Sequence, residues 1–312
     1  MKAIFTYDYG QENMQKLRDL GVEIVYSPED EFEYRPEMDG AEAIVCFNPF
    51  NKVDFSKMDS MKWIQLVSKG VNHVPENLRN CGKIITNNTQ TTSIPIGEWI
   101  VTYILNAFKM IKTFYGHQSR HEWIQEHEVK EICGKTIGIL GTGNIAREAA
   151  KRLKAFDATI IGVNTTGKPK EFFDEVYSFD TMEPFWGRCD VIVSTLPSTD
   201  RTYHIINADT IAKMKDGVTL VNISRGSIID TEAMLQANAQ GKFYAIALDV
   251  YEKEPLPDDS PIWSAENILA TPHTVMWSEN YFERCFETVY ANFAKYVKGE
   301  TLNDVVDFAK GY

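Results

Sequence analysis

Residues 137–146 form an apolar run that a glycine-rich turn interrupts, with the sequence Ile-Gly-Ile-Leu-Gly-Thr-Gly-Asn-Ile-Ala. An apolar run of this length before closely spaced glycines is typical of a buried parallel strand. Gly141 and Gly143 would form the tight turn and allow backbone N–H groups to approach a pyrophosphate. The helix expected from Asn144 to about Phe156 would point its positive end at the same phosphates. The run therefore predicts a dinucleotide site, and the alternative is a strand–helix turn without a ligand.

The length and composition of the chain limit its class. A chain of 312 residues predicts about two domains, and a hydrophobic share of 44% supplies enough apolar side chains for two cores. No apolar run approaches the ~20 residues that a membrane-spanning helix needs. The polar N-terminus does not resemble a signal peptide. The net charge of −12 disfavours nucleic acids and anionic membranes as partners.

The cysteines are scattered along the chain without any Cys-x-x-Cys pair. This spacing argues against a disulfide framework and against a zinc site. We therefore expect a protein of the reducing cytoplasm with no bound metal. The five residues are Cys46, Cys81, Cys133, Cys189 and Cys285.

Short apolar strands alternate with helical stretches in both halves of the chain, and this alternation predicts parallel sheets. The strands expected before the glycine-rich turn are Lys2–Tyr7, Glu23–Tyr26, Ala43–Phe47, Trp63–Ser68 and Lys83–Thr86. Those expected after it are Thr159–Val163, Val176–Phe179, Asp190–Leu196, Val218–Ile223, Ala245–Val250 and Ile268–Ala270. A long helical run from Ile96 to about Arg120 separates the two series.

We therefore expect an α/β fold with two doubly wound parallel-sheet domains. A flavodoxin-like substrate domain would comprise residues 1–95 and 285–312, and a Rossmann-type cofactor domain would comprise residues 96–284. The last helix, near Ser278–Lys298, would pack back on the first half and make that domain discontinuous. Ligands are expected in a cleft between the domains, at the C-terminal ends of the strands.

The residues after the second strand of a Rossmann unit select the cofactor. An NAD-binding unit usually carries an acidic residue there, which bonds the ribose 2′-hydroxyl. In this chain Asn164 takes that place, and Thr165, Thr166 and Lys168 follow it. Because asparagine does not repel a 2′-phosphate and Lys168 adds a positive charge, we predict a preference for NADP, with NAD as the alternative.

An arginine, a carboxylate and a histidine each follow a predicted strand in the last hundred residues. The run Val221–Gly226 places Arg225 at the end of an apolar strand, where its guanidinium fork could meet a carboxylate and a carbonyl oxygen. Asp249 follows the next apolar run, and His273 ends the segment Ala270–His273. Each of these residues alone is as easily structural. Together, after a dinucleotide fold, they indicate a catalytic site.

With these motifs the chain resembles the D-isomer-specific 2-hydroxyacid dehydrogenases over nearly its whole length. The residues that carry the resemblance are Gly141–Ala146, Leu196-Pro197, Asn222–Gly226, Leu248–Tyr251 with Glu254-Pro255, and Thr271–His273. The resemblance implies a catalytic triad of Arg225, Glu254 and His273. It also implies that Val67–His73 is the substrate-domain loop, in which the N–H groups of Gly70 and Val71 hold the substrate carboxylate.

The same resemblance implies further cofactor contacts. The amides of Asn144 and Ile145 would meet the pyrophosphate, and Ile223 and Asp249 would lie near the nicotinamide, with Asp249 accepting from its carboxamide. The residues implied on the adenine-ribose side and at the crossing of the cleft are Thr195, Leu196, Pro197 and Thr202.

The implied reaction follows from elementary chemistry. Reduction of a 2-keto acid needs a hydride at the carbonyl carbon and a proton on the oxygen. His273 would give that proton and Glu254 would orient its ring, while Arg225 would bind the carboxylate and stabilise the developing alkoxide.

Two residues depart from the family pattern near the predicted substrate site. Trp277 stands where small residues are common, and it would either narrow the pocket or pack on the neighbouring domain. Lys69 would add a charge for a phosphate or second carboxylate, or it would be solvated. The substrate therefore stays open among glyoxylate, hydroxypyruvate, pyruvate, branched 2-keto acids and 3-phosphohydroxypyruvate, although Phe47 and Phe50 favour a small or apolar substituent over a phosphate.

The histidines at 117, 121 and 127 lie in or after the long helical run. His117 and His121 have the spacing of helical metal ligands, but Glu122 and Glu126 do not share their helix face, so we interpret the group as a helix surface. The resemblance implies a homodimer through the 96–126 region, with Trp123 as a buried anchor.

Two function classes are consistent with the sequence. The first is an NAD(P)-dependent 2-hydroxyacid dehydrogenase that works mainly as a glyoxylate/hydroxypyruvate-type reductase, with a phosphoglycerate dehydrogenase-like enzyme as the variant. The second is a non-catalytic nucleotide-sensing module on the same fold. The complete triad favours the enzyme, because a sensor needs no proton donor.

Overall fold

Every strand in the computed structural model pairs in parallel with its neighbours, in two separate sheets. The structure describes residues 1–89 and 91–308. The chain divides into two units: unit 1 comprises Met1–Thr92 with Ser278–Tyr312, and unit 2 comprises Ser93–Trp277. The sequence analysis placed these divisions at residues 95/96 and 284/285. The prediction of two parallel-sheet α/β domains is confirmed.

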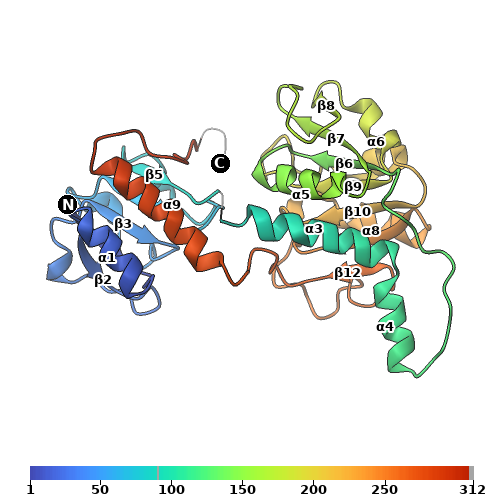
Figure 1. Cartoon of the computed structure of the whole chain (residues 1–312), viewed down its shortest axis with the longest axis horizontal. Helices are drawn as coiled ribbons and strands as arrows, with labels where there is room; N and C mark the ends of the chain where they lie inside the picture. Colours follow the sequence, from blue (N-terminus) through green and yellow to red (C-terminus); the bar gives the residue numbers. More distant parts are fainter. Residues whose placement is uncertain (90, 309–312) are drawn as a thin grey trace. The chain divides into compact units, whose positions relative to one another are not determined.

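Unit 1 is built on a five-stranded sheet in the order β2-β1-β3-β4-β5, which is the flavodoxin-like order of a doubly wound fold (Figure 1). Its strands are β1 (Lys2–Phe5), β2 (Glu23–Tyr26), β3 (Ala43–Cys46), β4 (Trp63–Leu66) and β5 (Ile84–Thr86). Its helices are α1 (Gln11–Asp19), the 3-10 turns η1 (Pro36–Met38) and η2 (Phe55–Lys57), α2 (Glu76–Arg79) and α9 (Tyr281–Tyr296).

The C-terminal helix α9 completes the core of unit 1. The ring of Phe293 lies 5.4 Å from that of Phe5 on β1 and 4.7 Å from that of Trp63 on β4. All three side chains are fully buried. Helix α9 therefore belongs to unit 1, which is discontinuous in sequence.

Unit 2 is built on a seven-stranded sheet in the order β12-β11-β10-β9-β6-β7-β8. The order reverses between β6 and β9, where a Rossmann fold binds its ligand beyond the carboxyl ends of the strands. The strands are β6 (Thr136–Leu140), β7 (Thr159–Asn164), β8 (Glu175–Ser178), β9 (Val191–Ser194), β10 (Val218–Asn222), β11 (Phe243–Leu248) and β12 (Ile268–Ala270). The helices are α3 (Ser93–Phe108), α4 (Ile111–Ser119), α5 (Asn144–Lys154), α6 (Glu183–Arg188), α7 (Ala208–Lys213), η3 (Gly226–Ile228) and α8 (Thr231–Ala239).

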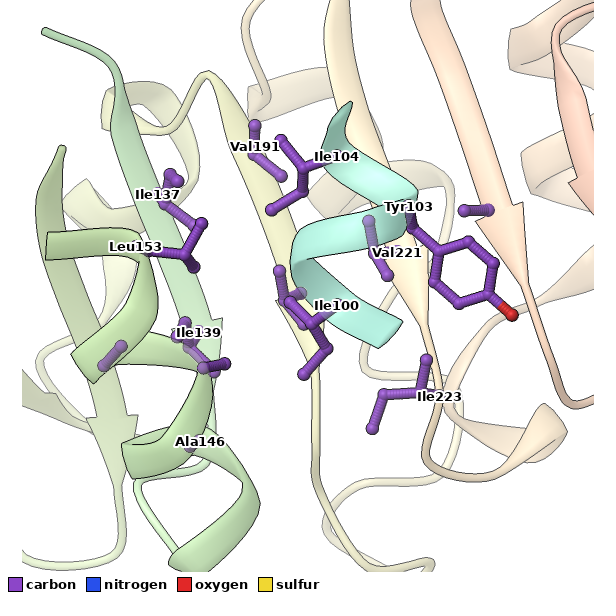
Figure 2. Packing of buried hydrophobic residues seen from close by; sticks show 14 of the residues in the cluster. Ile100, Tyr103, Ile104, Ile137, Ile139, Ala146, Leu153, Val191, Val221 and Ile223 are labelled. Atoms are coloured by element: carbon purple, nitrogen blue, oxygen red, sulfur yellow. The ribbon is translucent and has the colours of Figure 1, made fainter. Parts of the chain in front are cut away.

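Helices α3 and α5 cover one face of this sheet (Figure 2). Ile100 and Ile104 of α3 and Leu153 of α5 pack on apolar side chains of the central strands, among them Ile139 and Val191. All of these side chains are fully buried. Burial of the central strands explains why their sequences are continuous apolar runs, as is usual in a parallel sheet.

Two expectations about element bounds need correction. The run from Ile96 to Arg120 is not one helix, because Met110 adopts a left-handed conformation with φ 51° and separates α3 from α4. Several strands also end before their predicted limits, as in β1, which ends at Phe5 rather than Tyr7. Within residues 1–89 and 91–308, no helix combines the length and the apolar character that crossing a membrane requires.

Candidate active site

The glycine-rich turn after β6 contains two glycines in different situations. Gly141 has φ +95°, and a Cβ atom there would lie 2.5 Å from the hydroxyl oxygen of Thr195, so this turn requires glycine. Gly143 has φ −75°, and no atom lies within 4 Å of the position of its missing Cβ. Nothing in the protein itself therefore requires glycine at position 143, and the open space there fits a ligand that approaches the backbone.

The N-terminus of α5 follows directly. Gly143 is its N-cap and no side chain caps the first-turn amides, which include those of Asn144 and Ile145. Such amides, together with the helix dipole, form an anion site. The turn and the helix start therefore fit the pyrophosphate of a nicotinamide dinucleotide.

Asn164, at the end of β7, organises the loop that follows it. Its Oδ1 accepts hydrogen bonds from the amides of Thr166, at 2.9 Å, and Gly167, at 2.7 Å. Its Nδ2 donates to Thr142 Oγ1 and to Lys168 O, both at 3.1 Å. The side chain thus fixes an exposed loop that carries hydroxyls and one lysine, and Asn164 brings no carboxylate to the end of the strand.

The loop after β9 closes the other side of the glycine turn. The amide and hydroxyl of Thr195 both donate to Leu140 O at 2.9 Å. Thr202 is buried, and its hydroxyl donates to Pro197 O at 2.6 Å. The buried hydroxyl of Thr202 therefore fixes the backbone of this loop, whereas the side chain of Pro197 is exposed.

Arg225 stands at the C-terminal end of β10 on a turn that Asn222 holds. Asn222 Nδ2 donates to Arg225 O at 2.9 Å, and its Oδ1 accepts from the amide of Ser224 at 3.1 Å. In the described residues the guanidinium makes one side-chain hydrogen bond, from Nη1 to Ser224 O at 2.7 Å. Burial lowers the pKa of Arg225 and the negative charge of Glu254 acts in the opposite direction. Most of the guanidinium fork is therefore available to an anionic ligand.

His273 and Glu254 form a direct pair. The Nδ1 of His273 lies 2.8 Å from Oε2 of Glu254, and the other carboxylate oxygen accepts from the amide of Tyr251 at 2.9 Å. The side chains are 37% and 36% exposed, so the ring is reachable. The Nε2 atom of His273 has no hydrogen-bond partner among the described residues and is available as a proton donor.

Asp249 supports the turn that carries His273. Its fully buried carboxylate accepts from Thr271 Oγ1 at 2.5 Å, from the amide of Thr274 at 2.9 Å and from the amide of Val275 at 3.3 Å. Its backbone carbonyl also accepts from the amide of His273, which has φ 49°. Burial raises the pKa of Asp249, and these hydrogen bonds lower it in part. The structural alternative left open for Asp249 in the sequence, a residue that caps the end of its strand, is therefore consistent with these contacts.

The predicted substrate loop lies in unit 1, after β4. The amides of Gly70 and Val71 donate to no acceptor among the described residues. Ser68 Oγ donates to Gly70 O at 2.9 Å and Asn87 Nδ2 donates to Lys69 O at 2.8 Å, so the loop is fixed through its other polar groups. Two adjacent unused amides fit a carboxylate. Trp277, the last residue of unit 2, is exposed.

The histidine group at the end of α4 differs from the predicted helix surface. Helix α4 ends at Ser119, and the chain turns back so that Glu122 and Glu126 both reach His117. The distances are 3.0 Å from Nδ1 to Glu122 Oε2 and 2.8 Å from Nε2 to Glu126 Oε1. Shared helix faces could not reveal these contacts, because the two glutamates lie outside the helix. Residues 1–89 and 91–308 hold no group of three or more side chains suited to a metal ion.

A histidine–glutamate pair that the sequence did not predict uses the same short segment as Glu254. The Nε2 of His204 lies 2.6 Å from Oε1 of Glu252, two residues before Glu254. The only signal in the sequence is the position of Glu252 within the same short segment as Glu254. His204 is forty-eight positions away, so no spacing rule connects them.

The chain is similar to proteins of one known family. Residues 101–275 match the family model described as D-isomer specific 2-hydroxyacid dehydrogenase, NAD binding domain. The chain is 30% identical over 279 residues to the glyoxylate reductase of Thermofilum pendens, which covers 83% of this chain and 79% of that protein. It is 33% identical over 255 residues to the D-3-phosphoglycerate dehydrogenase of Methanocaldococcus jannaschii, with 80% of this chain and 48% of that protein covered.

A solved structure is similar over the whole chain. It is a D-isomer specific 2-hydroxyacid dehydrogenase family protein from Aeromonas salmonicida, with a TM-score of 0.82, 26% identity, and 98% and 99% of the two chains covered. The chain spans about half the length of several curated relatives that it matches, including the archaeal phosphoglycerate dehydrogenase.

Proposed function

The chain belongs to the D-isomer-specific 2-hydroxyacid dehydrogenases, and on this basis we propose that it reduces a small 2-keto acid to the D-2-hydroxy acid with a nicotinamide cofactor. The observation that carries the proposal is the His273–Glu254 pair, with its 2.8 Å contact and its accessible ring. Arg225 supports the proposal because it follows β10, the strand that pairs with β11, and Glu254 follows β11.

In the proposed reaction, the guanidinium of Arg225 in unit 2 binds the substrate carboxylate. The unused amides of Gly70 and Val71 in unit 1 are proposed separately as donors to a substrate carboxylate. The nicotinamide, when bound, supplies the hydride that forms the new C–H bond at the carbonyl carbon. His273 gives its Nε2 proton to the carbonyl oxygen, and Glu254 holds the ring through Nδ1 so that Nε2 keeps its direction. The positive charge of Arg225 stabilises the negative charge that develops on the oxygen.

The cofactor site lies in unit 2. We propose that Gly141, Gly143, Asn144 and Ile145 receive the pyrophosphate and that Thr195, Leu196, Pro197 and Thr202 shape the opposite wall. Ile223 would border the nicotinamide, and Asp249 would accept from its carboxamide.

We also propose NADP as the preferred cofactor. The loop after β7 presents Thr165, Thr166 and Lys168 to solvent, and Asn164 contributes no negative charge at the strand end. A 2′-phosphate would therefore meet hydroxyls, amides and a cation without repulsion. Comparison of kcat/KM with NADPH and NADH tests this preference, and a higher value with NADH would contradict it.

A small substrate of the glyoxylate or hydroxypyruvate type fits the surroundings of the substrate loop best. The ring of His73 lies 4.9 Å from that of Phe47 and 6.0 Å from that of Phe50. This aromatic group favours a small or apolar substituent over a phosphate. The glyoxylate reductase relative supports this choice, whereas the phosphoglycerate dehydrogenase relative keeps 3-phosphohydroxypyruvate as a second candidate, with Lys69 as its cation.

The test is oxidation of NADPH and NADH, followed by absorbance, against glyoxylate, hydroxypyruvate, pyruvate, 2-ketoisocaproate and phosphohydroxypyruvate. We expect turnover that His273→Ala reduces by about 10²- to 10⁴-fold, the usual contribution of a positioned acid. Arg225→Ala should raise the substrate KM and also lower kcat. Tight cofactor binding without turnover of any compound would instead favour the nucleotide-sensing module, and wild-type turnover in His273→Ala would refute the role of that residue.

We propose that the protein is a homodimer formed through the 96–126 region. In this region Trp123 is 95% exposed and Tyr115 is 67% exposed. Helix α4 and the segment after it extend away from the sheet of unit 2 (Figure 1). Large exposed aromatic side chains of this kind are typical of interface anchors. Light scattering after size exclusion should give twice the chain mass, and Trp123→Asp should shift the species to a monomer. A monomeric wild-type protein would contradict the proposal.

A further inference from the structure

The segment Tyr251–Pro255, which we call the strap, carries Glu254 past the turn that carries Arg225. The two backbones are in close contact at Gly226. A Cβ atom on Gly226 would lie 1.9 Å from the carbonyl carbon of Tyr251 and 2.3 Å from the amide nitrogen of Glu252. Because Glu254 is part of the strap, the position of the strap determines where the carboxylate of Glu254 lies relative to the ring of His273.

The strap is anchored by two carboxylates that are used in the same way. Glu254 contacts the ring of His273 with one oxygen and accepts from the amide of Tyr251 with the other. Glu252 contacts Nε2 of His204 with one oxygen, at 2.6 Å, and accepts from the amide of Thr231 with the other, at 3.1 Å. The amide of Thr231 belongs to the first turn of α8, so the second anchor fixes the strap to a helix.

His204 is itself held in one orientation. It has φ 47°, its amide donates to Ser227 O at 2.8 Å, and its ring stacks on that of Tyr203 with a centroid distance of 4.0 Å. Ser227 is two residues after Arg225 in the sequence. His204 thus contacts the Arg225 turn with its backbone and the strap with its side chain.

The His204–Glu252 pair is partly shielded from solvent. The two side chains are 26% and 33% exposed. Burial alone would raise the pKa of Glu252, but hydrogen bonds from Thr231 and His204 lower it below its usual value. The carboxylate therefore stays ionised and keeps both contacts at neutral pH.

We propose that His204 and Glu252 are positioning residues, which hold the strap so that Glu254 meets His273 and the Arg225 turn keeps its place beside them. This inference rests on the proposed function, because it concerns the same site. Neither residue needs to touch substrate or cofactor. Their effect is on the alignment of the proton donor, and small misalignments at a reacting centre are costly.

The first test compares Glu252→Ala with Glu252→Gln. We expect Glu252→Ala to lower kcat roughly 10- to 100-fold, with the Kd for NADPH and the midpoint of thermal unfolding close to wild type. Glu252→Gln keeps one oxygen that accepts from the amide of Thr231, and its NH2 group can donate to Nε2 of a neutral His204, so it should retain most of the wild-type kcat. Glu183→Ala is the matched control, since it also removes a glutamate from unit 2 that pairs with one cation, Lys213, on the surface.

A second variant protects the test against a folding failure of Glu252→Ala. His204→Asn keeps a residue that tolerates the left-handed backbone conformation at this position, but the shorter side chain does not reach Glu252. We expect the same loss of kcat with unchanged NADPH binding. Wild-type kcat in His204→Asn and in Glu252→Ala would overturn the proposal, as would equal losses in Glu252→Gln and Glu252→Ala.

A readout without turnover separates this inference from the proposed function. If the wild-type protein reduces none of the acids, backbone hydrogen exchange of residues 251–255 and 226–229 still reports on the strap. Faster exchange there in Glu252→Ala and His204→Asn, but not in Glu183→Ala, would support the anchor. Unchanged exchange in these segments would overturn it.

Discussion

Two glycines of one turn differ in the physical reason for their presence. Gly141 is required by its backbone conformation and by its contact with Thr195, so it serves the fold. Gly143 has an ordinary φ of −75° and empty space around its missing side chain, so it serves no packing need in the described structure. A methyl group at position 143 would occupy the space in which we expect the pyrophosphate.

We predict that Gly143→Ala weakens NADPH binding by about tenfold or more, equivalent to ~1.4 kcal/mol, and leaves the thermal midpoint unchanged or slightly raised, because alanine restricts the unfolded chain. Gly141→Ala should instead lower the midpoint. Gly187→Ala is the control, because its Cβ would make only an ordinary contact, 3.6 Å from Lys213 O. Fluorescence titration and calorimetry measure both quantities. Unaltered NADPH affinity in Gly143→Ala would argue against a pyrophosphate at this turn.

Motifs in the sequence selected three residues whose catalytic roles remain predictions. Arg225, Glu254 and His273 each lie near a predicted strand end, and the structure brings them together. The partners that orient them were not predictable, because His204 and Asn222 act through contacts that no local pattern encodes. A structural role for Asp249 was an open alternative, but its partners were not predictable, since they lie on the loop of residues 271–275.

At the scale of elements, the parallel strands were predictable and the helix break at Met110 was not. A continuous apolar run identifies a buried strand by composition alone. No glycine or proline stands between α3 and α4, and Met110 adopts a left-handed conformation that sequence patterns rarely announce. Because of the break, α4 does not continue along the axis of α3, and α4 and the segment after it extend away from the sheet of unit 2 (Figure 1).

Helix α4 and the segment 120–127 are joined through His117, and this junction should depend on pH. Hydrogen bonds that His117 donates to Glu126 and Glu122 raise the pKa of His117, and Arg120 helps to keep Glu122 ionised by lowering its pKa. A raised folded-state pKa means that the stabilisation is complete below the ordinary value of about 6.5. It is lost as the pH rises through the raised value.

We therefore predict that backbone hydrogen exchange in residues 122–127, corrected for its intrinsic pH dependence, accelerates as the pH rises from about 6 through the mildly alkaline range. In His117→Gln the corrected exchange should not vary over this range, because glutamine carries no titrating proton. A pH-independent exchange rate in the wild-type protein would show that the charged form of His117 does not hold this segment.

At the scale of the whole molecule, each unit has its own hydrophobic clusters. The residues predicted to bind the cofactor and the predicted catalytic residues all lie in unit 2, whereas the predicted loop for the substrate carboxylate lies in unit 1. The sequence indicated this division because each strand series has its own helices. The C-terminal helix α9 belongs to unit 1, and its aromatic contacts with β1 and β4 explain why.

Separate cores predict separate stabilities. Phe293 is fully buried between Phe5 and Trp63 in unit 1, and Phe185 is fully buried in unit 2 with its ring 5.5 Å from that of Trp186. Truncation of a buried phenylalanine to alanine costs about 3–5 kcal/mol. A cofactor at one hundred times its Kd stabilises the unit that binds it by about 2.7 kcal/mol.

Phe293→Ala should therefore reduce hydrogen-exchange protection in β1, β4 and α9 while β6 and α5 keep theirs, and Phe185→Ala should do the reverse. Saturating NADPH should restore protection in Phe185→Ala and leave unit 1 of Phe293→Ala unprotected, because the proposed cofactor contacts lie in unit 2. Exchange measured at low denaturant concentration resolves the two sets of peptides. Equal loss of protection in both units of either variant would mean that the chain unfolds as one cooperative body, and the two cores would then share their stability.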